Sequence, residues 1–156
     1  MTGIACCQID PQIGDLDGNA ERISAAIIDA RSAGADIIVL PELVTSGYML
    51  SDEAEARSVA LTRDDPRFTR WAEAAGDSLV VLGFCELGED GVLYNSAAVL
   101  DEGGVSAVYR KTHLWDREKL IFTPGRDLPP VLQTRHGVMA VMPVSYTHLR
   151  AHETLR

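Results

Sequence analysis

The sequence predicts an α/β domain built on a mixed β-sheet. Residues 3–41 carry a strand, helix and strand pattern that ends in a continuous apolar run. Later, two apolar runs over 94–100 and 105–109 flank residues 101–104, whose two glycines suit a hairpin. A strand, helix and strand unit makes parallel strands and a hairpin makes antiparallel ones, so together they predict a mixed sheet.

The first half of the chain divides into elements at its turn and capping residues. Residues 3–9 form a short apolar run that predicts the first strand, and residues 15–19 supply turn and capping side chains. Residues 20–32 carry apolar side chains at helical spacing, and Gly34 follows as a C-terminal cap, so we expect an amphipathic helix. The apolar run over 36–41 is typical of a strand covered on both faces.

The second half predicts further elements around the hairpin. A helix is expected over 65–75 and a strand over 78–85. Another apolar run, residues 138–142, predicts one more strand. The sequence contains no internal repeat and no low-complexity linker.

Composition limits the classes of function that fit. The chain has 156 residues, 46% of them hydrophobic, which is enough for one packed domain. Its net charge of -9 and the lack of a basic stripe argue against nucleic-acid binding. No apolar run reaches the length of a membrane span, and the first residues do not resemble a signal peptide, so we expect a cytoplasmic protein without membrane contact.

The three cysteines, Cys6, Cys7 and Cys85, suit neither a disulfide framework nor a zinc site. Their number is odd, and two are adjacent within an apolar segment. We therefore expect buried thiols in a reducing compartment. The sequence also has no glycine-rich phosphate loop and no cluster of cysteine and histidine ligands, so no metal, flavin or nucleotide cofactor is expected.

The end of the chain differs from the rest. Residues 143–156 lack apolar periodicity, and residues 144–154 match, letter for letter, the translation of a widely used transposon-based sequencing adapter. We therefore predict a native domain over 1–142 and a non-native tail over 143–156. The alternative is a genuine basic tail that binds a partner through Arg150 and Arg156.

Polar residues that could carry chemistry lie just beyond predicted strands, where α/β folds commonly place their sites. Glu42 follows one apolar run and Lys111 follows another, with Glu118 close by in sequence. Each also has a structural interpretation: a glutamate or lysine at a strand end is usually solvated. His113 could act as a general base, although a packed or loop histidine is the commoner outcome.

Three sequence segments taken together are more specific than any one of these residues alone. The segments LPELVTSGY, YRKTHLWDREKLIFTPG and GVMAVM occur in an order and at a spacing similar to those of the nitrilase superfamily. The resemblance covers residues 1–142 and implies the amino-terminal part of an α-β-β-α sandwich with mixed sheets. It implies that Glu42 is the catalytic glutamate, Lys111 the catalytic lysine and Glu118 the second glutamate.

The nucleophilic cysteine of that family follows a strand similar to GVMAVM and is expected near position 144. This chain has Pro143 and Val144 there. The resemblance therefore implies an amino-terminal fragment that lacks the nucleophile and is inactive as it stands. Cys85 lies at the end of another predicted strand, yet we expect a small buried thiol rather than a substitute nucleophile.

The resemblance implies a carbon-nitrogen hydrolase of the amidase or N-carbamoyl amidohydrolase type. A thiolate would attack a small linear amide or nitrile, Glu42 would move the protons, and Lys111 would stabilise the oxyanion. We expect two carboxylates to keep Lys111 protonated, and Glu42 to be buried. A homo-oligomer is expected for the full-length protein.

Two alternatives remain open at this stage. One is a non-catalytic pseudoenzyme that pairs with a full-length relative. The other is a small doubly wound domain that binds a ligand without catalysis, which the lack of a glycine-rich first turn disfavours.

Overall fold

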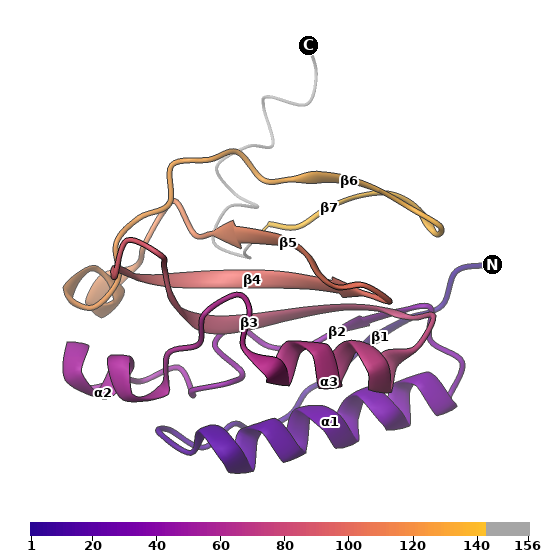
Figure 1. Cartoon of the computed structure of the whole chain (residues 1–156), viewed down its shortest axis with the longest axis horizontal. Helices are drawn as coiled ribbons and strands as arrows, with labels where there is room; N and C mark the ends of the chain where they lie inside the picture. Colours follow the sequence, from indigo (N-terminus) through magenta and orange to yellow (C-terminus); the bar gives the residue numbers. More distant parts are fainter. Residues whose placement is uncertain (143–156) are drawn as a thin grey trace.

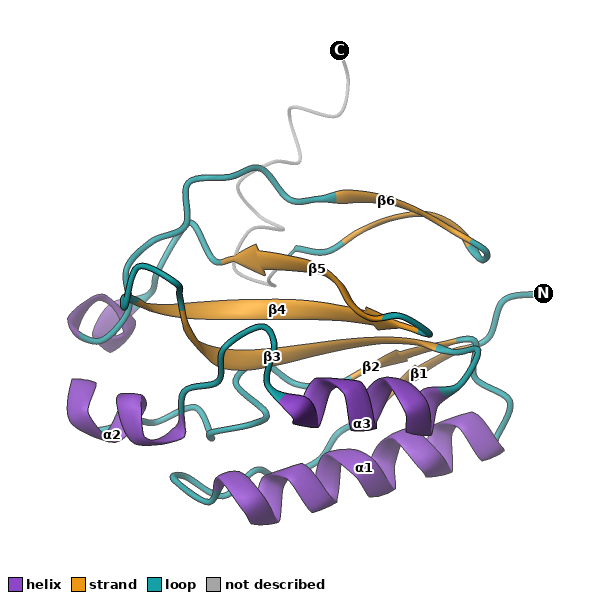
Figure 2. Cartoon of the chain, viewed as in Figure 1, coloured by secondary structure: helices purple, strands orange, loops and turns teal. Residues whose placement is uncertain are grey.

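The computed structural model describes residues 1–142, in which a mixed sheet carries helices on one side and a β-hairpin on the other (Figures 1 and 2). The predicted tail over 143–156 and the predicted nucleophile position near 144 lie outside the described residues. The elements, in chain order, are β1 (Ile4–Cys6), α1 (Leu16–Ser32), β2 (Ile37–Val39), α2 (Glu53–Val59), α3 (Pro66–Ala75), β3 (Leu79–Leu87), β4 (Leu93–Asp101), β5 (Gly104–Arg110), a 3-10 helix η1 (Asp116–Leu120), β6 (Val131–Thr134) and β7 (Gly137–Ala140).

The main sheet has the strand order β1-β2-β3-β4-β5. Strands β1, β2 and β3 are parallel, whereas β4 and β5 are antiparallel to their neighbours, which confirms the predicted mixed sheet. The register pairs Cys85 with Asn95 and Ser96 with Arg110. The start of β4 therefore lies beside the carboxyl ends of β3 and β5. These three strand ends lie together at one end of the sheet.

The two longer helices begin and end at capping residues. Helix α1 starts at Leu16, four residues earlier than expected, because Asp15 caps it by accepting a hydrogen bond from the Gly18 backbone N–H. Gly34, with a φ of 84°, follows its end as predicted. Helix α3 confirms the second predicted helix, with Asp65 as its cap and Pro66 in its first turn.

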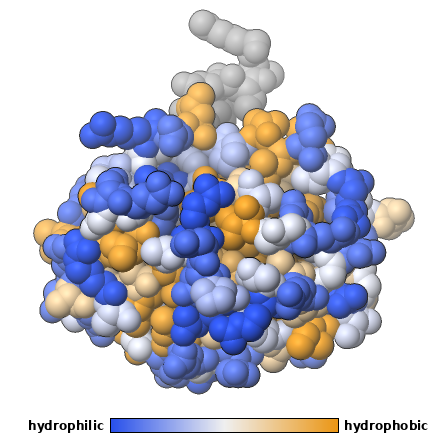
Figure 3. Space-filling model, viewed as in Figure 1, coloured by the Kyte–Doolittle hydropathy of each residue, from blue (hydrophilic) through white to orange (hydrophobic). Residues whose placement is uncertain are grey.

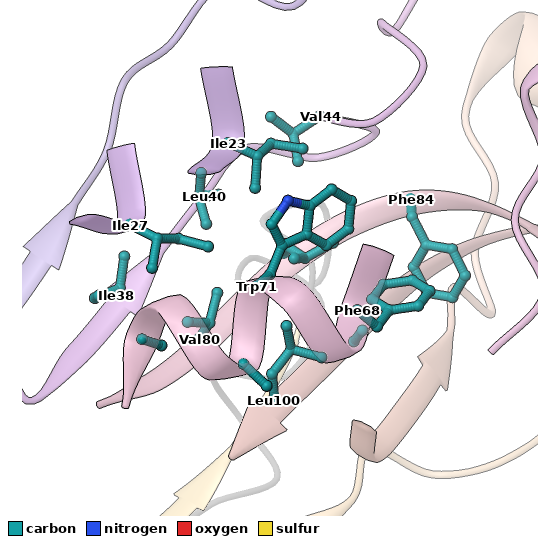
Figure 4. Close-up of a cluster of buried hydrophobic side chains, with 14 of the residues drawn as sticks. Ile23, Ile27, Ile38, Leu40, Val44, Phe68, Trp71, Val80, Phe84 and Leu100 are labelled. Carbon is teal, nitrogen blue, oxygen red and sulfur yellow. The ribbon is translucent and has the colours of Figure 1, made fainter. Parts of the chain in front are cut away.

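The principal core lies between these helices and the sheet (Figure 4). Ile23 and Ile27 of α1 are fully buried there. The Phe68 ring of α3 contacts two aromatic rings edge to face, with centroids 5.5 Å from Trp71 and 5.0 Å from Phe84. Such pairs add to the free energy gained by burial, so Phe68 joins helix and sheet.

Three elements were not predicted, namely α2, η1 and β6. Helix α2 buries only Ala56 and Val59, too few side chains to make a clear period, and depends on its Asp52 cap. The predicted strand over 138–142 exists as β7, but it pairs with β6 in a separate hairpin and does not join the main sheet.

The expectation that all three cysteines are buried is wrong for two of them. Cys85 is fully buried, but Cys6 is exposed and Cys7 is only partly covered. The reason is the place of β1 at the edge of the sheet, where its side chains and those just after it are covered by few neighbours.

The face seen in Figure 3 is mostly hydrophilic, with hydrophobic side chains showing in separate spots. Such scattered apolar exposure is ordinary for a protein surface. Among residues 1–142, no helix has the length and apolar character needed to cross a membrane.

We predict that Phe68→Ala lowers the free energy of unfolding by about 3–5 kcal/mol, because it leaves a cavity between α3 and β3. Urea unfolding monitored by circular dichroism measures this. Thr69→Ala, at the next and exposed position of α3, is the matched control and should change stability by less than about 0.5 kcal/mol. Equal effects of the two substitutions would contradict the described core.

Candidate active site

A cleft of about 830 Å³ separates the main sheet from the β6–β7 hairpin. The β6–β7 hairpin lies on the sheet face opposite α1 and α3 (Figure 1), and residues of both the sheet and the hairpin line the cleft. Most of the lining is apolar, but Glu42, Asn95 and Lys111 bring polar groups together at the end of the sheet where β2 and β5 finish and β4 begins. A mainly apolar cleft with a few convergent polar groups is the usual form of a small-molecule site.

Glu42 follows β2 in a tight turn that begins after Pro41. The turn is held to β3 by two backbone hydrogen bonds: Gly83 N–H donates to the Pro41 carbonyl at 3.1 Å, and Val44 N–H donates to the Gly83 carbonyl at 2.9 Å. Leu43 adopts a φ of 47°, a left-handed conformation that costs energy for a branched side chain. Its fully buried side chain anchors the turn.

Gly83 allows the turn to approach β3 closely. A Cβ atom at this position would lie 2.5 Å from the Leu43 nitrogen and 2.6 Å from the Glu42 Cα atom. Both are backbone atoms, so they could not give way without moving the turn. The absence of a side chain at Gly83 therefore positions Glu42.

Lys111 is the first residue after β5. Its N–H donates to the Asn95 carbonyl at 2.8 Å, and its own carbonyl accepts from the Gly125 N–H at 2.9 Å. A Cβ atom on Gly125 would lie 2.3 Å from the Arg110 carbonyl oxygen, so glycine is required for this contact. The backbone of Lys111 is thus held on two sides.

Glu118 lies in η1 and its side chain is 7% exposed. Its Oε1 accepts hydrogen bonds from Tyr48 Oη at 3.1 Å, Asn95 Nδ2 at 3.2 Å and Lys111 Nζ at 3.0 Å. Its Oε2 accepts from the Trp115 backbone N–H at 2.8 Å, which caps the start of η1. These four hydrogen bonds replace the water that the buried carboxylate has lost.

The centre of the site is the Lys111 ammonium, whose side chain is 5% exposed. Its Nζ lies 2.8 Å from Glu42 Oε1 and 3.0 Å from Glu118 Oε1. Burial alone would lower the pKa of Lys111, but the hydrogen bonds and charges of the two carboxylates outweigh it and raise this pKa above its ordinary value. Lys111 is therefore a fixed cation at neutral pH.

Within residues 1–142 the Glu42 side chain is 40% exposed, so the burial expected for the complete protein is not provided by this part of the chain. Glu42 Oε1 accepts from Lys111 Nζ and from Asn95 Nδ2, the latter at 2.7 Å. Among the described residues, Oε2 of Glu42 has no hydrogen-bond donor, and the residue lines the cleft. One carboxylate oxygen is thus fixed by two donors, and the other has none within residues 1–142 and is available to a ligand in the cleft.

Asn95 and Tyr48 are parts of the site that sequence reasoning missed. Asn95 lies within β4 and donates to both carboxylates. Tyr48 ends the segment LPELVTSGY, so its nearness to Glu42 in sequence was the one available signal. Burial, together with the negative charges of Glu118 and Glu42, raises the pKa of Tyr48 to about 12, so its hydroxyl stays protonated and donates.

Two other candidates lie apart from this cluster. Cys85 is fully buried in a second core cluster, its thiol donates to the Ala56 carbonyl, and burial raises its pKa to about 12. Such a thiol is a poor nucleophile. His113 is exposed, and its Nδ1 forms a hydrogen bond with the Thr112 hydroxyl. Within residues 1–142, no group of three His, Cys, Asp or Glu side chains is arranged to hold a metal ion.

Comparison with known families gives one assignment for most of the chain. Residues 3–147 match the model of the carbon-nitrogen hydrolase family. The match extends past residue 142, where we placed the end of the native domain, and reaches five residues into the segment predicted as a tail.

Individual relatives agree with this match. The chain is 37% identical over 128 residues to a nitrilase of Pyrococcus abyssi and 34% identical over 130 residues to an (R)-stereoselective amidase of a Pseudomonas species. These alignments cover 80% and 83% of this chain but 48% and 46% of the relatives, so the chain spans about half of their length.

A solved structure confirms the predicted fold class. The amidase of Nesterenkonia sp. AN1, in a form whose active-site cysteine carries acrylamide, superposes with a TM-score of 0.74 and is 25% identical. The alignment covers 90% of this chain and 56% of the amidase.

We predict that Lys111→Met lowers the free energy of unfolding by about 3–5 kcal/mol, because it leaves two neighbouring carboxylates without their cation. Denaturant unfolding at several pH values measures this. Because folding raises the pKa of Lys111, its stabilising contribution is complete below the unfolded pKa and is lost as pH rises through the folded one. The difference between the two proteins should therefore shrink only above about pH 10.

The control for this substitution is Lys119→Met, which changes the other lysine of the chain at an exposed position. It should leave stability nearly unchanged. A Lys111→Met protein as stable as this control would show that the buried ion pairs do not form.

We predict that Gly83→Ala displaces the turn that carries Glu42 and destabilises the protein by about 1–3 kcal/mol, because the new methyl group overlaps backbone atoms. Unfolding in urea and a crystal structure of the variant measure both effects. Gly103→Ala is the control, since a Cβ atom there would meet only the end of the Asp101 side chain, at 3.3 Å. A Gly83→Ala protein with unchanged stability and an unmoved Glu42 would contradict this account.

Proposed function

This chain belongs to the carbon-nitrogen hydrolase family, and we propose that its site serves an amidase-type hydrolysis of a small linear carboxamide. Its relatives include enzymes named nitrilase and amidase. The observation that carries the proposal is the pairing of Glu42, with one carboxylate oxygen open to the cleft, and Lys111, a buried cation at the same place. Amide hydrolysis needs both a group that moves protons and a fixed positive charge.

In the first half of the reaction, a cysteine thiol gives its proton to Glu42 as its sulfur attacks the carbonyl carbon. The carbonyl oxygen becomes an oxyanion. Lys111 can stabilise it, because an ammonium has three N–H donors and the two carboxylates occupy two of them. Glu42 then returns the proton to the leaving nitrogen, which departs as ammonia or an amine and leaves a thioester.

In the second half, Glu42 takes a proton from a water molecule as the water oxygen attacks the thioester carbonyl. The resulting oxyanion again lies beside Lys111. When the C–S bond breaks, the thiolate takes the proton from Glu42 and the carboxylic acid is released. Glu118 keeps Lys111 in place throughout, since it binds the ammonium at 3.0 Å.

The nucleophile is the component that this chain does not carry at the expected place, because residue 144 is a valine. Met142 lines the same cleft as Glu42 and Lys111. Two further residues span at most about 7 Å, so a cysteine near position 144 in the native continuation would be within reach of the cleft. We propose that the chain is an inactive amino-terminal fragment of the full-length hydrolase.

The proposal is tested in two steps. The source DNA is sequenced across the codons for residues 142–144 by a method that adds no transposon adapter, and the full-length protein is expressed. A cysteine soon after Met142 is expected. Ammonia release is then measured with primary amides, N-carbamoyl compounds and nitriles, and amides are expected to react fastest. If the codons for residues 144–154 proved genomic, the pseudoenzyme alternative would replace this proposal.

We predict that Glu42→Gln in the full-length protein lowers kcat/KM by roughly 100- to 10,000-fold, because glutamine cannot accept the thiol proton. Glu21→Gln, an exposed position on α1, is the control and should leave activity unchanged. Comparable activity in both variants would exclude Glu42 as the proton carrier.

A further inference from the structure

Asn95 touches each charged member of the site. It is 3% exposed and lies near the start of β4. Its side-chain nitrogen is 2.7 Å from Glu42 Oε1 and 3.2 Å from Glu118 Oε1. Its backbone carbonyl accepts the hydrogen bond from the Lys111 N–H. A single residue thus binds both carboxylates and the strand end that carries the ammonium.

We propose that Asn95 is a positioning residue for the hydrolysis described above, on which this inference rests. Its amide donates to one oxygen of Glu42, Oε1, and so fixes the plane of the carboxylate, while Oε2 has no donor among residues 1–142. Without this hydrogen bond, the carboxylate plane could rotate about the last bond of the Glu42 side chain, because such torsions are broad. The base would then be present but not aimed at the nucleophile.

The charges at the site explain why the side-chain amide of asparagine suits position 95. Glu42 and Glu118 together bring two negative charges to one ammonium, so the cluster carries a net negative charge. An amide nitrogen offers two N–H donors without adding charge. An aspartate of the same shape would offer acceptors only and would repel both carboxylates, whereas leucine would leave the carboxylate oxygens short of donors.

A buried serine outside the cleft offers a control. Ser78 is 6% exposed, and its hydroxyl donates to the Ala35 carbonyl at 2.8 Å. It is not among the residues that line the cleft. Ser78→Ala therefore removes a buried hydrogen bond away from the site and shows what a purely structural loss does.

The hydrogen bond between Asn95 and Glu42 can be tested on the 156-residue chain without measuring catalysis. Asn19 and Asn95 are its only asparagines, so selective labelling with 15N in the asparagine side chain should give two amide signals in NMR spectra. Asn95→Asp assigns them by removing one. Glu42→Gln should shift the Asn95 amide protons, and Glu21→Gln should not. An unshifted Asn95 signal would overturn the inference.

The catalytic consequence is tested in the full-length protein by pH profiles of kcat and kcat/KM. In the pH profile of kcat/KM, Asn95→Asp should move the low-pH limb by about one pH unit to higher pH. The reason is that the added negative charge favours protonation of the base, Glu42. Asn95→Leu should lower kcat about 10- to 100-fold with KM changed less than about threefold, since Asn95 acts through Glu42.

Ser78→Ala should leave both the low-pH limb and the value of kcat/KM unchanged. A wild-type protein without any hydrolysis would overturn the proposed function, whereas an active wild type with an unmoved limb in Asn95→Asp would overturn the positioning role alone.

Discussion

The site depends on one constraint: the Lys111 ammonium is buried, so its positive charge must be compensated by groups that contact it. An unpaired buried charge costs many kcal/mol, so each group near Nζ has to be placed to within hydrogen-bond distance. Glu42 and Glu118 supply the opposite charge at 2.8 and 3.0 Å. The two carboxylates then repel one another and need donors of their own, which Asn95 and Tyr48 provide.

To place these groups around Lys111, segments that are far apart in sequence must come together at one end of the sheet. The turn after β2, the start of β4 and the end of β5 meet there because β4 runs antiparallel to both its neighbours. Glycine makes the close approaches possible, with Gly83 beneath the Glu42 turn and Gly125 against Arg110. Such fixed geometry is what a catalytic site needs, since donors held in place require no rearrangement during the reaction.

The sequence predicted the parts of this arrangement that local patterns encode. Glu42 and Lys111 follow apolar runs that form strands, and Glu118 belongs to a motif similar to one in a known family, so all three could be named beforehand. Asn95 could not, because its contacts with Glu42 and Glu118 depend on strand register, which no local pattern in this chain reveals.

The most direct test of this account is the titration of Lys111 itself. Lys111 and Lys119 are the only lysines in the chain, so labelling lysine with 13C at Cε gives two NMR signals, and Lys119→Arg identifies the exposed one. The account predicts that Lys111 titrates with a pKa above the ordinary value of about 10.4. A pKa for Lys111 at or below that ordinary value would mean that burial outweighs the two carboxylates, and the charge cluster would be wrong.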